Sequence, residues 1–489
     1  MRKLIILFFL TLMYCSGSFA NNIIISNTRL TGQNTSSGYT MIEFDISWEN
    51  SWRISTDASN WDAAWVFVKY RVGSGEWQHA WLNNTGHTAP TGSIIDVGLL
   101  DPTTVFNTIT NPCLGVFIYR NSNGMGTFSL SNVKLQWNYS ANGLNDNDII
   151  DFQVFAIEMV YVPQGNFELG SGGSGVSEFY KYPSLTSPYL ITDESEITVG
   201  TSTDNLYYST GTYGGDQSGP VPATFPKGFN AFYCMKYEIS QQGYVDFLNN
   251  LNQTQANTRK FTTSGYRYYI NGSTIGNYVT TNPYVACNYL GWDDLTSYFD
   301  WSGLRPMTEL EFEKACRGTS PAVPNEYAWG NTNLCAVPYF LNNSGTVNEI
   351  VTNFASSPNG NSSYNTTDGS IDGPLRVGIF ATNTSDRIES GATYYGIMDM
   401  SGNLWERAVT IGHSVGRLFD GTMGDGVLDT NGNANANTWP GTDALGSGFL
   451  GGNWYHANLS LQVSRRGNAA NVNIGRSYNY GGRGVRSLP

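Results

Sequence analysis

YGIMDMSGNLWE, residues 395–406, sets two acidic residues on either side of a glycine turn. Asp399 and Glu406 offer carboxylate oxygens, and a turn at Gly402 and Leu404 exposes backbone carbonyl oxygens between them. A hard cation such as calcium takes about six to eight oxygen ligands. The stretch is therefore suited to a structural calcium ion.

The same stretch also has an interpretation without a metal ion. Asp399 would then only form a turn, Glu406 would pair with the neighbouring Arg407, and Trp405 would fill the core. The two interpretations differ in one consequence. Chelation destabilises the fold only if calcium binds there, because a ligand that binds only the folded state stabilises it.

Six segments of the C-terminal two-thirds resemble, in one order, those of the formylglycine-generating (sulfatase-modifying factor) family. They are MVYVPQGNFELGS (159–171), FYCMKYEISQQGYVDFL (232–248), LRPMTELEFEKACRG (304–318), YGIMDMSGNLWE (395–406), FLGGNWYHA (449–457) and GGRGVRS (481–487). The resemblance implies an irregular fold related to C-type lectins, with few helices, short strands and loops held by ions. It also implies structural calcium at Asp399, Gly402, Leu404 and Glu406.

The resemblance does not extend to the catalytic residues of the family. Catalytic members place two cysteines after the Gly-Gly segment, where the thiolates bind copper and drive oxidation. His456 and Leu461 stand at those positions here, Asn453 replaces the active-site serine, and no cysteine follows Cys335. We therefore expect no copper and no catalytic residues, although an oxidase remains an alternative function.

A second enzymatic branch of the superfamily uses non-heme iron held by histidines of a helical domain. The N-terminal part of this chain contains only His79 and His87, in segments that read as strand and loop. The C-terminal part contains only His413 and His456. Since no helical histidine spacing is present, the sequence gives little support to this alternative.

The resemblance implies a second calcium site and an altered set of disulfides. Counterparts of the second site are Asn342, Asn343, Asp368 and Ser370. Phe299 and Ser487 occupy family cysteine positions, whereas Cys316 is retained, with Cys287 or Cys335 as possible partners. Pairing among these and Cys234 stays open, and Cys113 is expected to be a buried apolar residue.

The first twenty residues predict an export signal. Arg2 and Lys3 precede an apolar run over residues 4–14, and cleavage is expected after Ala20. A lipoprotein anchor at Cys15 is the alternative, but Tyr14 stands where a small residue is expected. We expect a secreted, periplasmic or cell-surface protein without a transmembrane segment. The net charge of −13 argues against nucleic acid as a partner.

The chain divides into two expected domains of an α+β protein. Short alternating strands over residues 21–152 predict an antiparallel β-sandwich of immunoglobulin type, and residues 153–489 form the family-like domain, with a loop-rich excursion at 165–226. One helix is expected after Ser240. A second follows Thr308, whose capping box with Glu311 marks its start, and it ends at Gly318.

The C-terminal loops suggest a non-catalytic binding protein. Asn, Arg, Tyr and Ser suit polar recognition of a glycan or a protein, and variable receptor-binding proteins use the same surface architecture. Alternatively, these loops are merely solvated, or the protein is a structural part of a surface assembly that docks to an envelope partner through its N-terminal domain. The expected binding surface comprises Tyr455, His456, Arg465, Arg466, Asn468, Asn471, Asn473, Arg476, Tyr478 and Tyr480.

Overall fold

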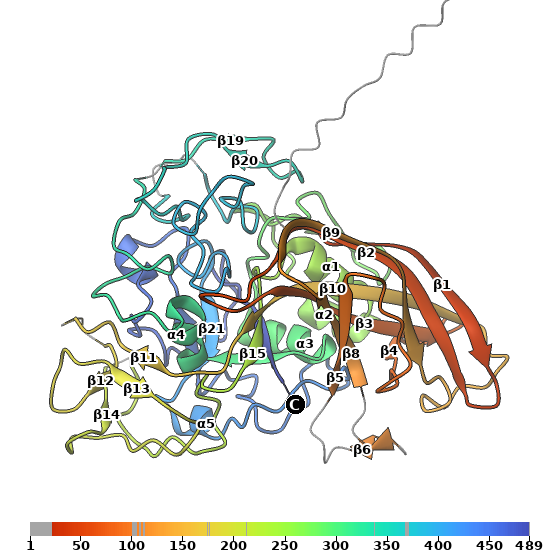
Figure 1. Cartoon of the computed structure of the whole chain (residues 1–489), viewed down its shortest axis with the longest axis horizontal. Helices are drawn as coiled ribbons and strands as arrows, with labels where there is room; N and C mark the ends of the chain where they lie inside the picture. Colours follow the sequence, from red (N-terminus) through yellow and green to blue (C-terminus); the bar gives the residue numbers. More distant parts are fainter. Residues whose placement is uncertain are drawn as a thin grey trace, which may run out of the picture.

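The computed structural model describes residues 22–99, 105–106, 109–110, 113–173, 175, 177–211, 213–336, 338–366 and 371–488. The expected export signal at residues 1–20 lies outside the described residues. Strands dominate the N-terminal part, and loops with short helices dominate the rest (Figure 1). The fold is α+β, as the sequence predicts.

Two antiparallel sheets face each other in the N-terminal part. The first contains β1 (Ile24–Asn34), β2 (Tyr39–Arg53) and β9 (Gly124–Trp137) in the order β1-β2-β9. Alternate residues of β2 and β9 turn inward, because successive side chains of a strand point to opposite faces. Their apolar side chains pack against β3 (Asp62–Val72) and β8 (Cys113–Arg120) of the second sheet to form one core.

The second sheet contains strands of both the N-terminal and the C-terminal parts. Its strand order is β22-β21-β18-β23-β15-β10-β3-β8-β5, with β4 beside β3. Only the pairing of β18 with β21 is parallel. The remaining strands of this sheet are β4 (Gln78–His79), β5 (Ser93–Leu99), β10 (Ile150–Val162), β15 (Phe232–Met235), β18 (Arg305–Thr308), β21 (Glu406–Val409), β22 (Ser447–Leu450) and β23 (Gly484–Ser487).

Strand β10 joins the N-terminal and C-terminal parts. It pairs with β3 from Ile150 opposite Val72 to Val160 opposite Asp62, and its last four residues also pair with β15. The sequence predicts a boundary between residues 152 and 153, which lie inside this strand. The two parts therefore share one continuous sheet.

Two of the helices pack on the face of β3 that points away from the N-terminal sheet, through Phe247 and Trp301. Helix α1 (Gln241–Asn249) begins after Ser240, and α4 (Glu309–Arg317) has the expected capping box between Thr308 and Glu311 and ends at Gly318. Both predicted helices are thus confirmed. The other helical segments are α2 (Gln253–Arg259), α3 (Trp292–Trp301), α5 (Ser414–Arg417) and the 3-10 turn η1 (Asn458–Leu461).

The loop-rich excursion at 165–226 contributes core side chains as well as short strands. Phe167, Leu169 and Phe179 are buried in the main core. The short strands outside the two large sheets form pairs: β6 (Val105–Phe106) with β7 (Ile109–Thr110), β11 (Phe167–Leu169) with β13 (Tyr189–Ile191), β12 (Tyr180–Lys181) with β14 (Leu206–Tyr207), β16 (Ile270–Asn271) with β17 (Val279–Thr280), and β19 (Leu341–Asn342) with β20 (Ile350–Val351).

Within the described residues the cysteines are free and buried. Cys113 is a core residue, as expected, and burial raises its pKa to about 12. The disulfides considered for Cys316 with Cys287 or Cys335 are not formed. Burial also raises the pKa of Cys234 to about 12, so these thiols contribute packing rather than reactivity.

Among the described residues, none of the helices combines the length and apolar character that crossing a membrane requires.

Candidate functional site

The loop at 399–406 has an unusual backbone. Asp399, Gly402 and Asn403 have φ angles of 60°, 99° and 58°. Left-handed backbone is uncommon outside glycine, and Asp and Asn tolerate it best. Such conformations cluster at sites where the surrounding structure determines them. The deciding stretch of the sequence is therefore a tightly constrained loop.

Hydrogen bonds from neighbouring segments hold this loop. Asp399 Oδ2 accepts from the Gly378 N–H at 2.6 Å. The side chain of Asn403 donates to Glu238, and Glu238 Oε1 accepts from the Leu404 N–H at 2.9 Å. Glu238 is a site residue that the sequence analysis missed, although its segment just before α1 belongs to the motif at 232–248.

Glu406 lies in β21 and is fully buried. Its Oε1 accepts from Arg483 Nε at 2.5 Å, while its Oε2 has no hydrogen-bond partner. Arg407, the partner considered from the sequence, instead donates to Asn473 O and Ser447 Oγ. Glu406 therefore keeps one carboxylate oxygen available for a further positive charge.

Three buried carboxylates share this region. Burial is the main cause that raises the pKa of Glu238, Asp399 and Glu406 above their ordinary values, and repulsion between these groups adds to the shift for Glu238 and Glu406. Arg483 opposes it for all three. One guanidinium does not balance three carboxylates, and Arg376 adds a second positive charge near Asp399. The raised pKa values indicate that the two arginines do not fully compensate ionisation of the three carboxyl groups.

Two features of this loop bear on the predicted calcium site. Glu406 Oε2 is a buried acceptor without a partner, and no backbone N–H of the described residues donates to the carbonyl oxygen of Gly402 or Leu404. Within the described ranges, no three His, Cys, Asp or Glu side chains form a metal-binding group. A calcium ion here would therefore need the backbone oxygens that the sequence analysis assigned to it.

The second predicted calcium site is only partly described. Asn342 ends strand β19, and Asn343 follows it with φ 54° in an exposed turn. The Asn343 side chain donates to Asn348 O at 3.2 Å. Asp368 and Ser370 lie outside the described residues, so this site stays a prediction.

The Gly-Gly segment carries a polar turn in place of thiols. Asn453 is buried, and its Oδ1 accepts from the backbone N–H groups of Tyr455 and His456 at 2.9 and 3.2 Å. Its Nδ2 donates to His456 Nδ1 at 2.6 Å. Because Nδ1 accepts, the neutral imidazole carries its proton on Nε2. Burial lowers the pKa of His456.

Leu461, at the position of the second family cysteine, is fully buried. It packs in a small core with Tyr327 and Trp329. His456 and Leu461 therefore differ in surroundings, since His456 is exposed. Leu461 therefore contributes to packing and offers no reactive group.

Four aromatic side chains and His456 gather beside the Gly-Gly turn. Ring centroids of Tyr266 and Tyr478 lie 4.6 Å apart, and Tyr455 lies 5.4 Å from Tyr478. Trp454 contacts all three tyrosines, and Tyr455 contacts His456. We call Tyr266, Trp454, Tyr455, His456 and Tyr478 the aromatic cluster.

Loop residues from two distant segments build the aromatic cluster. Tyr266 follows α2 in the chain and is 42% exposed, and Tyr455 is 39% exposed. Asn288 donates to the carbonyl oxygens of Tyr266 and Tyr478 at 2.9 and 3.0 Å. The sequence analysis missed Tyr266, because nothing in its local pattern places it beside residues 454–478.

The expected binding surface contains both buried and exposed residues in the structure. Arg466 is a correction, since it is 1% exposed, pairs with Glu309, and lies over the rings of Phe179 and Tyr208. An arginine in the sequence suggests a surface position, but a buried carboxylate and two rings accommodate this one.

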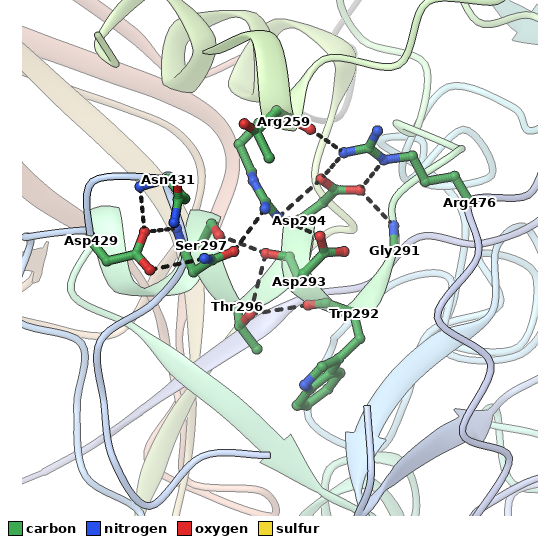
Figure 2. Close-up of polar contacts among 12 residues, drawn as sticks. Arg259, Gly291, Trp292, Asp293, Asp294, Thr296, Ser297, Asp429, Asn431 and Arg476 are labelled. Atoms are coloured by element: carbon green, nitrogen blue, oxygen red, sulfur yellow. Dashed lines mark hydrogen bonds and ion pairs between the residues drawn. The ribbon is translucent and has the colours of Figure 1, made fainter. Parts of the chain in front are cut away.

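Arg476 is occupied by an ion pair. It bonds to Asp294 at 2.5 Å, next to the pair of Arg259 with Asp293 (Figure 2). Asn473 is exposed and donates to the Tyr480 hydroxyl at 3.1 Å. Arg465, Asn468, Asn471 and Tyr480 are half-buried. The exposed part of the expected surface is therefore narrower than its sequence range.

The histidines considered for iron do not converge. His79 is buried in β4 and bonds to Leu114 O at 2.6 Å through Nε2. His87 Nδ1 accepts from the Gln136 N–H at 3.1 Å. Both are bound within the N-terminal sheets, and neither belongs to a metal-binding group of the described residues.

The loop at 399–406, which we call the acidic loop, and the Gly-Gly turn lie in a loop-rich α+β domain. This combination is typical of formylglycine-generating-enzyme-like proteins. The family model described as "Sulfatase-modifying factor enzyme 1-like domain" matches residues 152–488. The chain belongs to this family.

Two further comparisons concern individual proteins. Among solved structures, variable protein 1 of Treponema denticola is similar at 13% sequence identity and a TM-score of 0.32, over 68% of this chain and 96% of that one. No curated protein sequence matches the chain.

Proposed function

We propose that this protein is an exported, non-catalytic binding protein that presents the aromatic cluster to a glycan or protein ligand. The observation that carries the proposal is the contrast at the Gly-Gly turn. Leu461 is buried in apolar surroundings, whereas Tyr455 and Tyr266 of the aromatic cluster are 39% and 42% exposed. Tyrosine rings offer contact area at low entropic cost together with a polar tip.

The binding test uses retention of the purified chain on a glycan array and on an envelope fraction. Replacing Tyr455 with alanine is expected to weaken saturable retention by about tenfold or more, since an aromatic anchor in an interface contributes at least about 1–2 kcal/mol. The matched control is Tyr213→Ala, which removes a tyrosine that is 48% exposed outside the cluster. Equal retention of both variants would contradict the proposal.

We also propose that calcium bound at Asp399, Gly402, Leu404 and Glu406 stabilises the domain. The cluster of three buried carboxyl groups and the unpartnered Glu406 Oε2 support it. Calcium would supply positive charge and hold the loop, with no part in a reaction. The second site at Asn342, Asn343, Asp368 and Ser370 is proposed in the same structural role.

Calcium removal is expected to lower the thermal midpoint. At a calcium concentration 100 times its Kd, binding adds about 2.7 kcal/mol to the free energy of unfolding, and EDTA should remove that amount. Glu406→Gln should abolish the response to calcium. Asp57→Asn changes an exposed aspartate and should keep the full response. A melting curve that EDTA leaves unchanged would overturn the assignment.

A further inference from the structure

Strand β1 forms an open edge of the N-terminal sheet. In the order β1-β2-β9 it pairs with β2 alone, and Figure 1 shows it at the right-hand side of the molecule, away from the C-terminal part. Within the described residues, the backbone N–H groups of residues 24–32 have no hydrogen bond to any segment other than β2. An edge strand of this kind presents free N–H and C=O groups to which a further strand can bond.

Two irregularities divide β1 into shorter regular stretches. Its register with β2 shifts between Ser26 and Arg29 and again between Thr31 and Asn34. Such bulges prevent another sheet from pairing along the whole edge. The regular stretch at residues 29–31 is therefore suited to a short segment rather than to a long strand.

A groove of about 290 Å³ lies beside this regular stretch, and we call it the β1 groove. One wall is formed by β1 from Leu30 to Gln33, and the other by residues of the chain between Leu144 and Ile150. The Gln33 side chain joins the two walls, since its Nε2 donates to Asp146 O at 2.9 Å. The groove and the free edge are thus neighbouring parts of one surface.

Apolar side chains are exposed at the β1 groove. Leu30 is 38% exposed, and Leu144 and Ile150 of the opposite wall are half-buried. Ile149, which stands between two residues of that wall, is 85% exposed. Apolar side chains that gather at an exposed site are typical of interaction surfaces. A partner that covers them removes apolar area from water.

The β1 groove carries negative charge. Asp146 and Asp148 line it and are exposed, and none of the described residues that line it is Lys or Arg. Asp146 Oδ1 accepts from the Tyr139 hydroxyl at 2.6 Å, and Asp148 Oδ2 accepts from the Asn145 N–H at 2.7 Å. These uncharged donors hold the carboxylates in place without neutralising them. A basic partner is therefore favoured over a neutral or acidic one.

A second copy of the chain fits the β1 groove poorly. Arg29 is the single charged residue of β1, and its guanidinium already bonds to Glu43. The chain as a whole has a net charge of −13, so two copies repel each other at an acidic surface. The partner is therefore expected to be a different protein with a basic segment.

We propose that the β1 groove binds a short extended segment of another protein that carries both apolar and basic residues. Its backbone adds to β1 as a further strand at residues 29–31, in the mode in which an extended peptide joins a sheet edge. Its apolar side chains contact those of both walls, while its basic side chains lie at Asp146 and Asp148. The proposal does not rest on the aromatic cluster.

The test measures the binding of labelled octapeptides to the full chain by fluorescence anisotropy. An acetylated peptide of two Lys-Lys-Val-Val repeats is expected to bind saturably, with a Kd of about 100 μM or lower. Its Glu-Glu-Val-Val counterpart should bind at least about tenfold more weakly, because its glutamates meet the acidic wall of the groove.

Replacing both acidic residues, as Asp146→Asn with Asp148→Asn, should weaken binding of the lysine peptide about fivefold or more and reduce its salt dependence. Asparagine keeps an oxygen that accepts the same hydrogen bonds, so the variant is expected to fold. The matched control is Asp57→Asn, which changes an exposed aspartate outside the groove and should leave the affinity unchanged. Tyr455→Ala should also leave it unchanged.

Backbone methylation of the peptide tests the strand pairing itself. The amides of odd-numbered and even-numbered residues point to opposite edges of a strand, so methylating one set blocks one edge. One of the two methylated lysine peptides should lose binding, and the other should keep it.

Absence of saturable binding by the lysine peptide would overturn the proposal, as would equal binding of the lysine and glutamate peptides. Unchanged binding of both methylated peptides would overturn it by excluding strand addition. Loss of binding in Tyr455→Ala would place the peptide at the aromatic cluster instead. A dimer seen by light scattering and dissociated by Leu30→Lys would assign the β1 groove to a second copy and overturn the proposal too.

Discussion

Replacing Lys236 with methionine is expected to lower the free energy of unfolding by about 3–5 kcal/mol, because removing one partner of a buried ion pair leaves uncompensated charge. Lys236 directly follows β15 and is 1% exposed. Its ammonium lies 3.1 Å from Asp62 Oδ2 and 3.0 Å from Glu158 Oε2. Chemical denaturation at pH 7 measures the loss.

Acid should reduce the deficit of the Lys236 variant. Burial raises the pKa of Glu158 to about 7 even with Lys236 present, and removing the ammonium raises that pKa further. A carboxyl group whose pKa is higher in the folded state stabilises the fold when protonated. The variant should therefore recover stability relative to the unmodified chain as the pH falls from alkaline values to about 7, and the two chains should respond alike below that pH, where Glu158 is protonated in both.

The matched control is Lys181→Met. Lys181 pairs with Asp204 at 2.8 Å, but both side chains are largely exposed, so the expected change in the free energy of unfolding is small. If Lys236→Met lost as little stability as the control, Lys236 would not be compensating the buried charges of Asp62 and Glu158.

Replacing Trp65 with alanine is the second large effect, with an expected loss of about 3–5 kcal/mol from the cavity it leaves. Trp65 is fully buried in β3, and its Nε1 donates to Ser302 O of the C-terminal part at 2.8 Å. The guanidinium of Arg486 lies 4.3 Å from its ring. Arg486 in turn donates to Gly98 O. This indole therefore links the two parts.

Phe340→Ala provides the control, because Phe340 is 60% exposed and should change stability by no more than about 0.5 kcal/mol. Differential scanning calorimetry should also show one unfolding transition for the Trp65 variant, since the shared sheet couples both parts. Two separate transitions would contradict the coupling of the two parts through the shared sheet, and a loss as small as that of Phe340→Ala would contradict the role assigned to Trp65.

The local elements were the most predictable from sequence. The helix at 309–317 begins at a capping box whose reciprocal bonds depend only on Thr308 and Glu311. The strand around Trp65 is a continuous apolar run, because both faces of β3 are covered. Such features depend on neighbours in the chain, which a sequence displays directly.

Contacts between residues far apart in the chain were harder to predict from the sequence. Arg466 lies beside Glu309 only because a C-terminal loop meets the start of α4, far from it in the chain, in the core. Tyr266 joins the aromatic cluster through Asn288, which no local pattern indicates. The acidic loop was located from Asp399 and Glu406, but its contact with Glu238 depends on the packing of the segment before α1.

Strand β10 has a consequence for how such chains arise by recombination. Modular proteins exchange parts at exposed linkers, where a new neighbour disturbs few contacts. Here the junction runs through Ile150–Val162, whose backbone is bonded to β3 along most of its length and to β15 at its end. A crossover in this strand would have to preserve the register with both partners at once. The N-terminal sheets and the family domain are therefore expected to be inherited together as one unit.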